Sequence, residues 1–492
     1  MANLRVSLLL AFLSCGVISP SAPTDDWNQP FRPQYHFSPQ SQWTNDPNGL
    51  VYFEGEYHLF FQYNPFGDEW GHMSWGHAVS NDLLHWHELP VALPEEHGVM
   101  IFTGSTVVDE NNSSGFCTQG KACLVAIYTG HTPETKSQAA LQTQNLAYSN
   151  DRGRTWRKYG GNPVLDLHMS DFRDPKVFWS TERKHWVMVA SLPNEHKVKI
   201  YGSPDLKKWT ALSEFGPAGA TGGQWECPEL FRLPVEGKAG EARWVMKVGV
   251  NPGARLGGSG EQYFVGRFDG KRFVNDNQAT QTMWTDYGKD CYCALTFNGL
   301  PREHKPVMIG WMDNWQYAAK LPTSPWRGQM TIPRELSLRE TPEGIRLVQQ
   351  PIEELRALAD GKTGELKTHS FRFADALPLD KGDEVGWRIL MGDGKYTAIG
   401  YSIRRKVLFV DRTHSGLVGF SSDFSARLEA PLVLSGKELE LKVLVDRCSI
   451  EVFADSGRVT STNLVFPPAD AMSIKAFGGA PEIRAEQIRS IH

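Results

Sequence analysis

Three short blocks of the sequence each place a carboxylate one or two residues before a proline. They read Trp-Thr-Asn-Asp-Pro-Asn-Gly, Phe-Arg-Asp-Pro and Trp-Glu-Cys-Pro-Glu, and their carboxylates are Asp46, Asp174 and Glu226. Carboxyl groups that share a site can divide the work of acid–base and nucleophilic catalysis, because one can be ionised while another holds a proton. These three residues are therefore the first candidates for chemistry.

The segments after these blocks indicate how the carboxylates are positioned. Each block is followed by an apolar run, a turn and a second apolar run, which is the pattern of a β-hairpin rich in aromatic and β-branched residues. A further repeat is a strand that ends in a Ser-x-Asp turn and leads to a tryptophan, as at Trp86, Trp156 and Trp209.

Repeats of roughly 50 residues built from short strands are typical of propeller blades. The sequence predicts five blades, over residues 46–98, 99–165, 172–222, 224–282 and 284–345. Because equivalent positions of a radial array converge on one axis, we expect the three carboxylates to face one another.

The pattern changes after the fifth repeat. Residues 351–361 are expected to form a linker or short amphipathic helix, and residues 362–492 contain short alternating strands that indicate a β-sandwich. The predicted fold is therefore all-β, with a five-bladed β-propeller over residues 23–350 followed by a C-terminal β-sandwich. None of the three blocks, with their aromatic residue, carboxylate and proline, is repeated in the sandwich, so we assign catalysis to the propeller.

The N-terminus and the composition restrict compartment and partners. Residues 1–22 combine Arg5, a short apolar run and small residues, which predicts a signal peptide and a secreted, extracellular or periplasmic protein. Cys15 offers lipoprotein anchoring as an alternative. The run is too short to span a bilayer, and no other apolar run is long enough to do so. The net charge is −5 with no basic stripe, so a nucleic-acid partner is not expected.

Seven cysteines are present. Cys117 and Cys123 lie close together, and a local disulfide between them is plausible in an exported protein. The other cysteines have no metal-ligand spacing, so no metal is expected.

The three blocks, in this order, resemble the signature blocks of glycoside hydrolase family 32, which contains invertases, inulinases and levanases. The resemblance continues in five further segments: Trp75-Gly76-His77, Trp311 to Trp315, Pro322 to Gly328, Val445 to Arg447 and Glu451 to Phe453. It implies a five-bladed propeller followed by a sandwich, retaining hydrolysis and no cofactor. It also implies that Asp46 is the nucleophile, Glu226 the acid/base and Asp174 a stabiliser of the transition state.

The resemblance also implies a set of substrate-binding residues. They are Trp43, Asn45, Gln62, Trp70, Phe102, Thr103, Arg173, Tyr292 and Trp311. Arg173 is expected to keep the adjacent Asp174 ionised. The sequence departs from commoner members at several positions, including Thr103 for Ser and Cys293 for Ala.

The leading hypothesis is a secreted retaining exo-β-fructosidase acting on levan, inulin and sucrose. One alternative is an invertase with little action on polymers. Another, from a different class, is a catalytically inactive fructan-binding protein, against which the intact carboxylate trio argues. The sequence leaves open the preferred linkage, the role of the sandwich and the oligomeric state.

Overall fold

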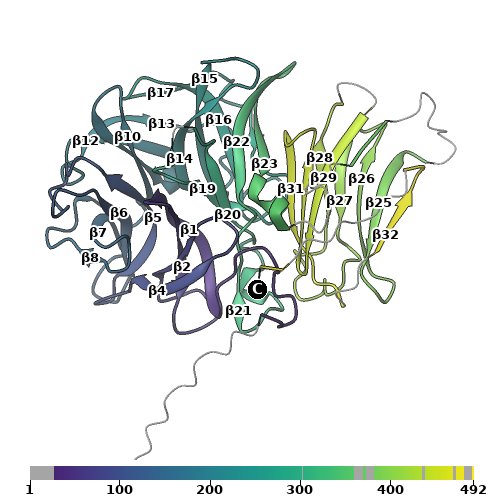
Figure 1. The fold of residues 1–492 in the computed structure, drawn as a ribbon, viewed down its shortest axis with the longest axis horizontal. Coiled ribbons are helices and arrows are strands. Elements are labelled where there is room, and N and C mark those ends of the chain that lie inside the picture. Colours follow the sequence, from purple (N-terminus) through teal and green to yellow (C-terminus); the bar gives the residue numbers. More distant parts are fainter. Residues whose placement is uncertain are drawn as a thin grey trace, which may run out of the picture.

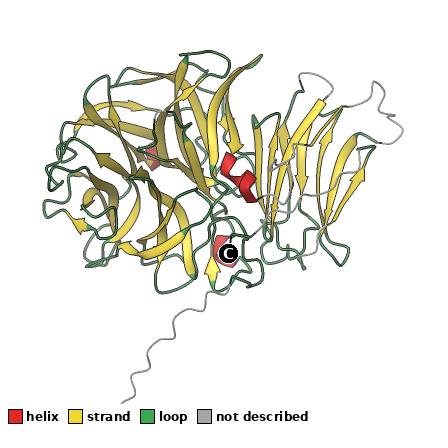
Figure 2. Ribbon diagram, in the orientation of Figure 1, coloured by secondary structure: helices red, strands yellow, loops and turns green. Residues whose placement is uncertain are grey.

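The computed structural model describes residues 27–301, 303–358, 369–372, 382–434, 438–468, 473–480 and 490–491. The predicted signal peptide, residues 1–22 with Cys15, lies outside this part, as do residues 359–361 of the predicted linker. Strands dominate the described chain (Figure 2). Its only helical elements are three 3₁₀ segments: η1 (Pro193–Glu195), η2 (Ala318–Lys320) and η3 (Glu353–Leu358).

Five antiparallel sheets, the blades, surround one axis and form the larger part of the molecule, from purple to green in Figure 1. Blade 1 contains β1 (Gln42–Phe53), β2 (Glu56–Asn64), β3 (Ser74–Ser80) and β4 (His87–Leu93), with β21 (Trp326–Arg327) added parallel to β1. Blade 2 contains β5 (Met100–Asp109), β6 (Cys123–Thr132), β7 (Leu141–Ser149), β8 (Arg157–Lys158) and β9 (Leu165–Met169).

The remaining three blades follow the same plan. Blade 3 contains β10 (Arg173–Ser180), β11 (His185–Leu192), β12 (Lys197–Ser203) and β13 (Thr210–Phe215). Blade 4 contains β14 (Gln224–Pro234), β15 (Ala242–Asn251), β16 (Gly260–Phe268), β17 (Phe273–Asn275) and β18 (Met283–Trp284). Blade 5 contains β19 (Tyr292–Thr296), β20 (Val307–Trp311), β22 (Arg334–Thr341) and β23 (Gly344–Pro351).

The first strand of every blade lies innermost and carries a register shift near its beginning. The shifts fall between Thr44 and Pro47, Ile101 and Gly104, Arg173 and Lys176, Glu226 and Glu229, and Tyr292 and Leu295. A bulge bends its strand and redirects a side chain. The five bulges therefore form one ring, and this ring contains the predicted site.

Buried polar contacts join the blades along the axis. Lys176 of blade 3 pairs with Glu229 of blade 4 at 2.7 Å. Glu261, which pairs with Lys247 within blade 4 at 2.7 Å, accepts from the amide of Ala294 of blade 5 at 2.8 Å. Further along the axis, Asn298 donates its amide to the carbonyl groups of Thr106 and Val177. Paired charges and satisfied amides are required here because an unpaired polar group in a dry core is costly.

The C-terminal domain is a sandwich of two antiparallel sheets, on the right of Figure 1. One sheet contains β24 (His369–Arg372), β29 (Glu438–Asp446), β30 (Ser449–Ala454) and β31 (Val459–Leu464). The other contains β28 (Arg427–Pro431), β27 (Val407–Asp411), β26 (Tyr396–Ser402), β25 (Glu384–Leu390) and β32 (Ser473–Phe477). The predicted fold class is confirmed.

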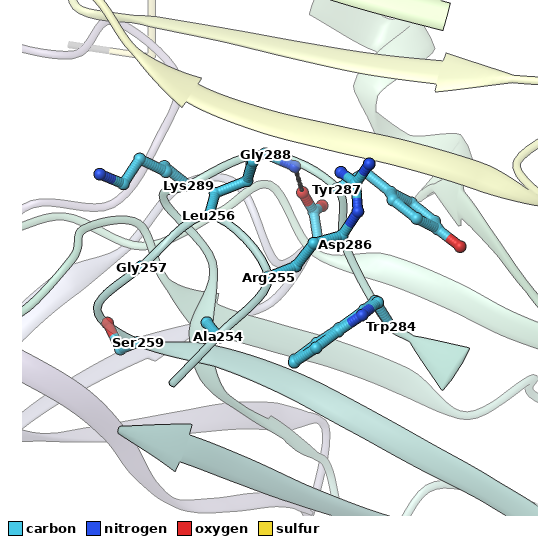
Figure 3. Close-up of a pocket in the computed structure, with 11 residues that line it drawn as sticks. Ala254, Arg255, Leu256, Gly257, Ser259, Trp284, Asp286, Tyr287, Gly288 and Lys289 are labelled. Carbon is cyan, nitrogen blue, oxygen red and sulfur yellow. Dashed lines mark hydrogen bonds between the residues drawn. The ribbon is translucent and has the colours of Figure 1, made fainter. Parts of the chain in front are cut away.

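Buried charges hold the two domains together. Arg412 of the sandwich forms an ion pair with Asp290 of the propeller, and neither side chain has exposed surface. Tyr317 donates its hydroxyl to Asp290, and Arg412 donates to that hydroxyl at 2.9 Å. Figure 3 shows the propeller loop that precedes Asp290 in the chain, where the Gly288 amide donates to Asp286 at 2.8 Å.

A second buried network lies at the same interface. His36 contacts Asp446 at 2.8 Å and Glu451 at 3.3 Å, and Glu451 also pairs with Arg334. Burial alone would lower the pKa of His36, but the two carboxylates raise it to about 9. His36 is thus a cation near neutral pH and contributes to the charge balance of the interface.

We predict that Arg412→Met lowers the free energy of unfolding by about 3–5 kcal/mol, because it leaves Asp290 buried and unpaired while preserving most of the side-chain volume. The control is Lys305→Met, since Lys305 pairs with Glu335 while 55% exposed; it should cost less than about 1 kcal/mol. Denaturant unfolding measures both, and equal losses would contradict the assignment of the interface to this pair.

Candidate active site

Asp46 lies in the bulge of β1, and donors fix both of its carboxylate oxygens. The Thr103 hydroxyl donates to Oδ2 at 2.6 Å, and the Asn45 amide donates to Oδ1 at 3.1 Å. Asn45 is held in turn by the Trp43 indole, which donates to its carbonyl oxygen at 2.8 Å. The carboxylate therefore has one orientation, set by blades 1 and 2.

Asp174 occupies the bulge of β10, where its backbone φ is +63°. This left-handed conformation is tolerated by Asp better than by most residues. The Thr129 hydroxyl accepts from its amide at 3.0 Å, and the Cys227 amide donates to its Oδ2 at 2.9 Å. Blades 2 and 4 thus position the carboxyl group of blade 3.

Glu226 begins the bulge of β14, and two donors from neighbouring blades hold its carboxyl group. Arg173 contacts Oε1 at 2.9 Å, and the Tyr292 hydroxyl donates to Oε2. Burial and the charge of Glu226 raise the pKa of Tyr292 well above its usual value, so the phenol keeps its proton. The three predicted catalytic carboxylates are thereby brought to one place.

Burial and mutual repulsion govern the charge of this group. Burial raises the pKa of Asp46 to about 6, opposed by Thr103 and Asn45 and assisted by the charge of Glu226. Burial also raises the pKa of Asp174 to about 8. Perturbed carboxyl groups that share a site are typical of catalysis.

The expectation that Arg173 keeps Asp174 ionised is wrong. Arg173 Nε lies 3.9 Å from Asp174, while its terminal nitrogens contact Glu226, Gln224 and Asp171 at 2.7–2.9 Å. Arg173 lowers the pKa of Asp174, but burial and the charge of Glu226 outweigh it. Asp171 and Gln224, absent from the predicted set, hold the guanidinium in place.

Aromatic side chains form the outer wall of the site. Trp70, in the segment between β2 and β3, is 46% exposed, and its ring lies 6.1 Å from that of half-buried Phe102. Phe102 stacks on His131 with ring centroids 4.4 Å apart. An exposed indole beside a polar pocket is suited to contact the apolar face of a sugar ring.

Three residues predicted to bind substrate are placed deeper than expected. Trp311 has no exposed surface and Trp43 only 1%, and both rings pack against Trp315. The Gln62 amide donates to the Ile101 carbonyl group at 2.9 Å and is likewise buried. The ring of Trp311 also packs against that of Trp43, and the contact of Trp311 with substrate stays a prediction.

The structure contains two disulfides in its described residues. The pairing of Cys117 with Cys123 is confirmed. The second joins Cys227 to Cys293, inside the ring of bulges, whereas Cys291 and Cys448 are free and buried. The sequence offered little signal for the second pairing, because 66 positions separate the two residues.

Comparison with known proteins identifies the family. The model of the glycosyl hydrolases family 32 N-terminal domain matches residues 36–351, and that of the family 32 C-terminal domain matches residues 337–490. The chain belongs to glycoside hydrolase family 32. It is therefore a glycoside hydrolase, as the clustered carboxyl groups indicate.

Relatives within family 32 match over nearly the whole chain. The levanase of Bacillus subtilis is 44% identical over 98% of this chain and 73% of its own length. The extracellular exo-inulinase of Aspergillus awamori is 42% identical over 94% of this chain and 95% of its own. The crystal structure of exo-inulinase from that organism has a TM-score of 0.86 and 40% identity, covering 95% of this chain and 100% of the other.

The hydrogen bond from Thr103 to Asp46 yields a prediction about pH. A bond from a neutral donor to a carboxylate contributes about 1.5–3 kcal/mol, and one pKa unit corresponds to about 1.4 kcal/mol. Removal of the hydroxyl in Thr103→Val should raise the pKa of Asp46, so the rise of kcat/KM with pH should move upward by roughly one unit.

Thr103→Ser retains the hydroxyl and is the matched control, with a profile like that of wild type. Rates measured from pH 4 to 8 for the three proteins test the expectation. If the rise of kcat/KM with pH in Thr103→Val occurs at the same pH as in wild type, Asp46 does not control that rise.

Proposed function

We propose that this protein is a retaining exo-β-fructosidase that removes terminal β-D-fructofuranosyl units from levan, inulin and sucrose. The observation that carries the proposal is the meeting of Asp46, Asp174 and Glu226 from three blades, each with its own set of donors. Family membership and the levanase and exo-inulinase relatives support fructose-linked substrates.

In the proposed mechanism Asp46 attacks the anomeric carbon of the terminal fructosyl unit. Its two hydrogen-bond donors fix the orientation of the carboxylate. One of its two oxygens can give up its hydrogen bond as the new bond to carbon forms. Glu226, which must take up a proton before this step, gives it to the departing oxygen, while Arg173 and Tyr292 hold its carboxyl group in place. A covalent fructosyl–Asp46 ester results.

Water completes the proposed cycle. Glu226, now ionised, removes a proton from the water that attacks the ester, and Asp46 is released. Two displacements at one carbon retain the β configuration. Asp174 binds sugar hydroxyls; with its pKa raised to about 8 it can donate as well as accept a hydrogen bond near neutrality.

The depth of the site supports attack at chain ends. Asp46 is 9% exposed and Asp174 5%, so little of the surface of these reacting groups is accessible. We propose that the site accepts one terminal sugar and leaves no passage for a chain to continue. Exposed Trp70 at its edge offers the next sugar a surface, which favours polymers over sucrose alone as substrates.

We also propose that the protein is exported. A signal peptide at residues 1–22 remains our prediction, and the two disulfides fit an oxidising compartment. One of the relatives is named as extracellular. The described residues include no helix with the length and apolar character needed to cross a membrane.

The domain boundaries predicted above remain our proposal: a propeller over residues 23–350, a linker over 351–361 and a sandwich over 362–492. The candidate binding residues, Trp311 among them, likewise remain proposed. We propose that substrate binding and catalysis require no metal or other cofactor.

Glu226→Ala separates the roles of the carboxylates. We predict that it slows sucrose hydrolysis at least about a hundredfold but fructosyl fluoride hydrolysis much less, because a good leaving group needs little protonation. Asp46→Asn is the control and should lose turnover on both substrates, since an amide cannot attack the anomeric carbon. Equal losses on both substrates for Glu226→Ala would exclude it as the acid.

The early products test the proposal as a whole. We expect levan and inulin to release fructose one unit at a time, first in the β configuration, with little early change in polymer length. Chromatography of early digests and proton NMR measure both. A ladder of oligosaccharides would indicate an endo-enzyme, hydrolysis of sucrose alone an invertase, and no hydrolysis at all a binding protein.

A further inference from the structure

The Cys227–Cys293 disulfide lies among the catalytic carboxyl groups. Cys227 directly follows Glu226, and Cys293 directly follows Tyr292, whose hydroxyl donates to Glu226. The bridge therefore ties the bulge of β14 to that of β19. Both cysteines are buried, at 1% and 0% exposure.

Each of the three carboxylates depends on the position of Cys227. Its amide donates to Asp174 Oδ2 at 2.9 Å, and its sulfur lies 3.7 Å from Asp46 Oδ2. Glu226 is its neighbour in the chain. A shift of Cys227 would therefore displace the contacts of all three groups together.

The backbone at both cysteines needs such a restraint. Cys227 has φ +47° and Cys293 φ +46°, a conformation that is uncommon for non-glycine residues and costs of order 1 kcal/mol or more. Such residues persist where the surrounding structure holds them. A covalent link between the two bulges supplies that restraint at the point where the site is built.

The bridge also has a chemical consequence for Asp46. A disulfide sulfur carries no proton, so its approach to Oδ2 is a van der Waals contact and keeps one side of the carboxylate dry. A thiol at the same place is a weak donor. Cleavage of the bridge would therefore give the carboxylate either a thiol or water as a new neighbour, and both favour its ionised form.

We infer that the Cys227–Cys293 disulfide is a positioning element of the catalytic site, which fixes Glu226 and Asp174 relative to Asp46 and keeps Asp46 free of a sulfur donor. This inference rests on the proposed function. The bridge acts through the carboxyl groups, while the Cys117–Cys123 bridge, in a loop far along the chain from these residues, offers a matched comparison.

The first measurement establishes the bond in the secreted wild-type protein. Digestion after blocking of free thiols, followed by mass spectrometry, should find Cys227 linked to Cys293, with Cys291 and Cys448 as thiols. An enzyme of full activity in which Cys227 and Cys293 are both thiols would overturn the inference.

The second measurement compares variants. In Cys227→Ala/Cys293→Ala we expect kcat on sucrose to fall about tenfold to a hundredfold, as for a small misplacement of reacting groups. KM should stay within about threefold, and the acid limb of kcat/KM should move to lower pH. Cys293→Ala alone leaves Cys227 as a thiol and should show the same changes as the double variant. It replaces the double variant in the test if that protein does not fold.

Cys117→Ala/Cys123→Ala is the control and should keep wild-type kcat and pH profile. A Cys227→Ala/Cys293→Ala protein with a lower melting temperature but unchanged kcat, KM and pH profile would show that the bridge only stabilises the fold. That result would overturn the inference. A wild-type protein that hydrolyses no fructoside would instead refute the proposed function.

Reduction of the wild-type protein offers the same comparison without substitution. Tris(2-carboxyethyl)phosphine delivers two electrons, and two protons are taken up to give the Cys227 and Cys293 thiols, while the phosphine becomes its oxide with an oxygen atom from water. Loss of kcat should follow the appearance of these two thiols and not those of Cys117 and Cys123. Activity that persists after both thiols appear would contradict the inference.

Discussion

Burial of Asp46 and Asp174 beside the partly buried Glu226, within one another's electric field, is the constraint on which the rest of the structure depends. Buried like charges repel, and each carboxyl group responds by retaining a proton unless donors or cations compensate. The nearby cation Arg173 directs its terminal nitrogens to Glu226 and Asp171. Asp174 is left with one backbone donor and a pKa of about 8, and Asp46 with two side-chain donors and a pKa of about 6.

This division of donors separates the groups by charge. Asp46 loses its proton near neutrality, as its proposed role of nucleophile requires, whereas Asp174 can keep one, which suits its proposed role as a donor to sugar hydroxyls. Residues of like type in like positions of three blades thus acquire different properties from their neighbours alone. The ring of bulges is the backbone feature that makes this possible, because a bulge bends each first strand near its beginning.

Local pattern predicted the hairpins and their repeat, because aromatic and β-branched runs bounded by turns identify strands without tertiary knowledge. The convergence of Asp46, Asp174 and Glu226 followed from the repeat. In the sandwich, β28 and β32 give weak sequence signals: the sequence Arg-Leu-Glu-Ala-Pro of β28 is short and ends in proline, and both strands lie at sheet edges. Edge strands carry weak patterning because they pack on fewer neighbours.

Features decided by tertiary contact were harder to predict. Arg173 adjoins Asp174 in sequence but turns its terminal nitrogens to Glu226, which is 53 residues away. Trp311 lies in a strand whose residues are all buried, so alternation could not indicate which way the indole faces. The partners Cys227 and Cys293 belong to different blades, and only the closed ring brings their bulges together.

The sandwich bears on the site through the segments that enter the propeller. Asp446 accepts from the amides of Gln34 and Tyr35, and Glu451 accepts from the amide of Ile332. The Met330 amide donates to the Phe37 carbonyl group and so joins these two segments. Phe37 precedes β1 in the chain, and Met330 follows β21. Since β1 carries Asp46 and pairs with β21, the interface that orders these segments also fixes the position at which β1 begins. The sandwich therefore contributes to catalytic geometry through buried charges some distance from the reacting groups, whatever else its outer surface does.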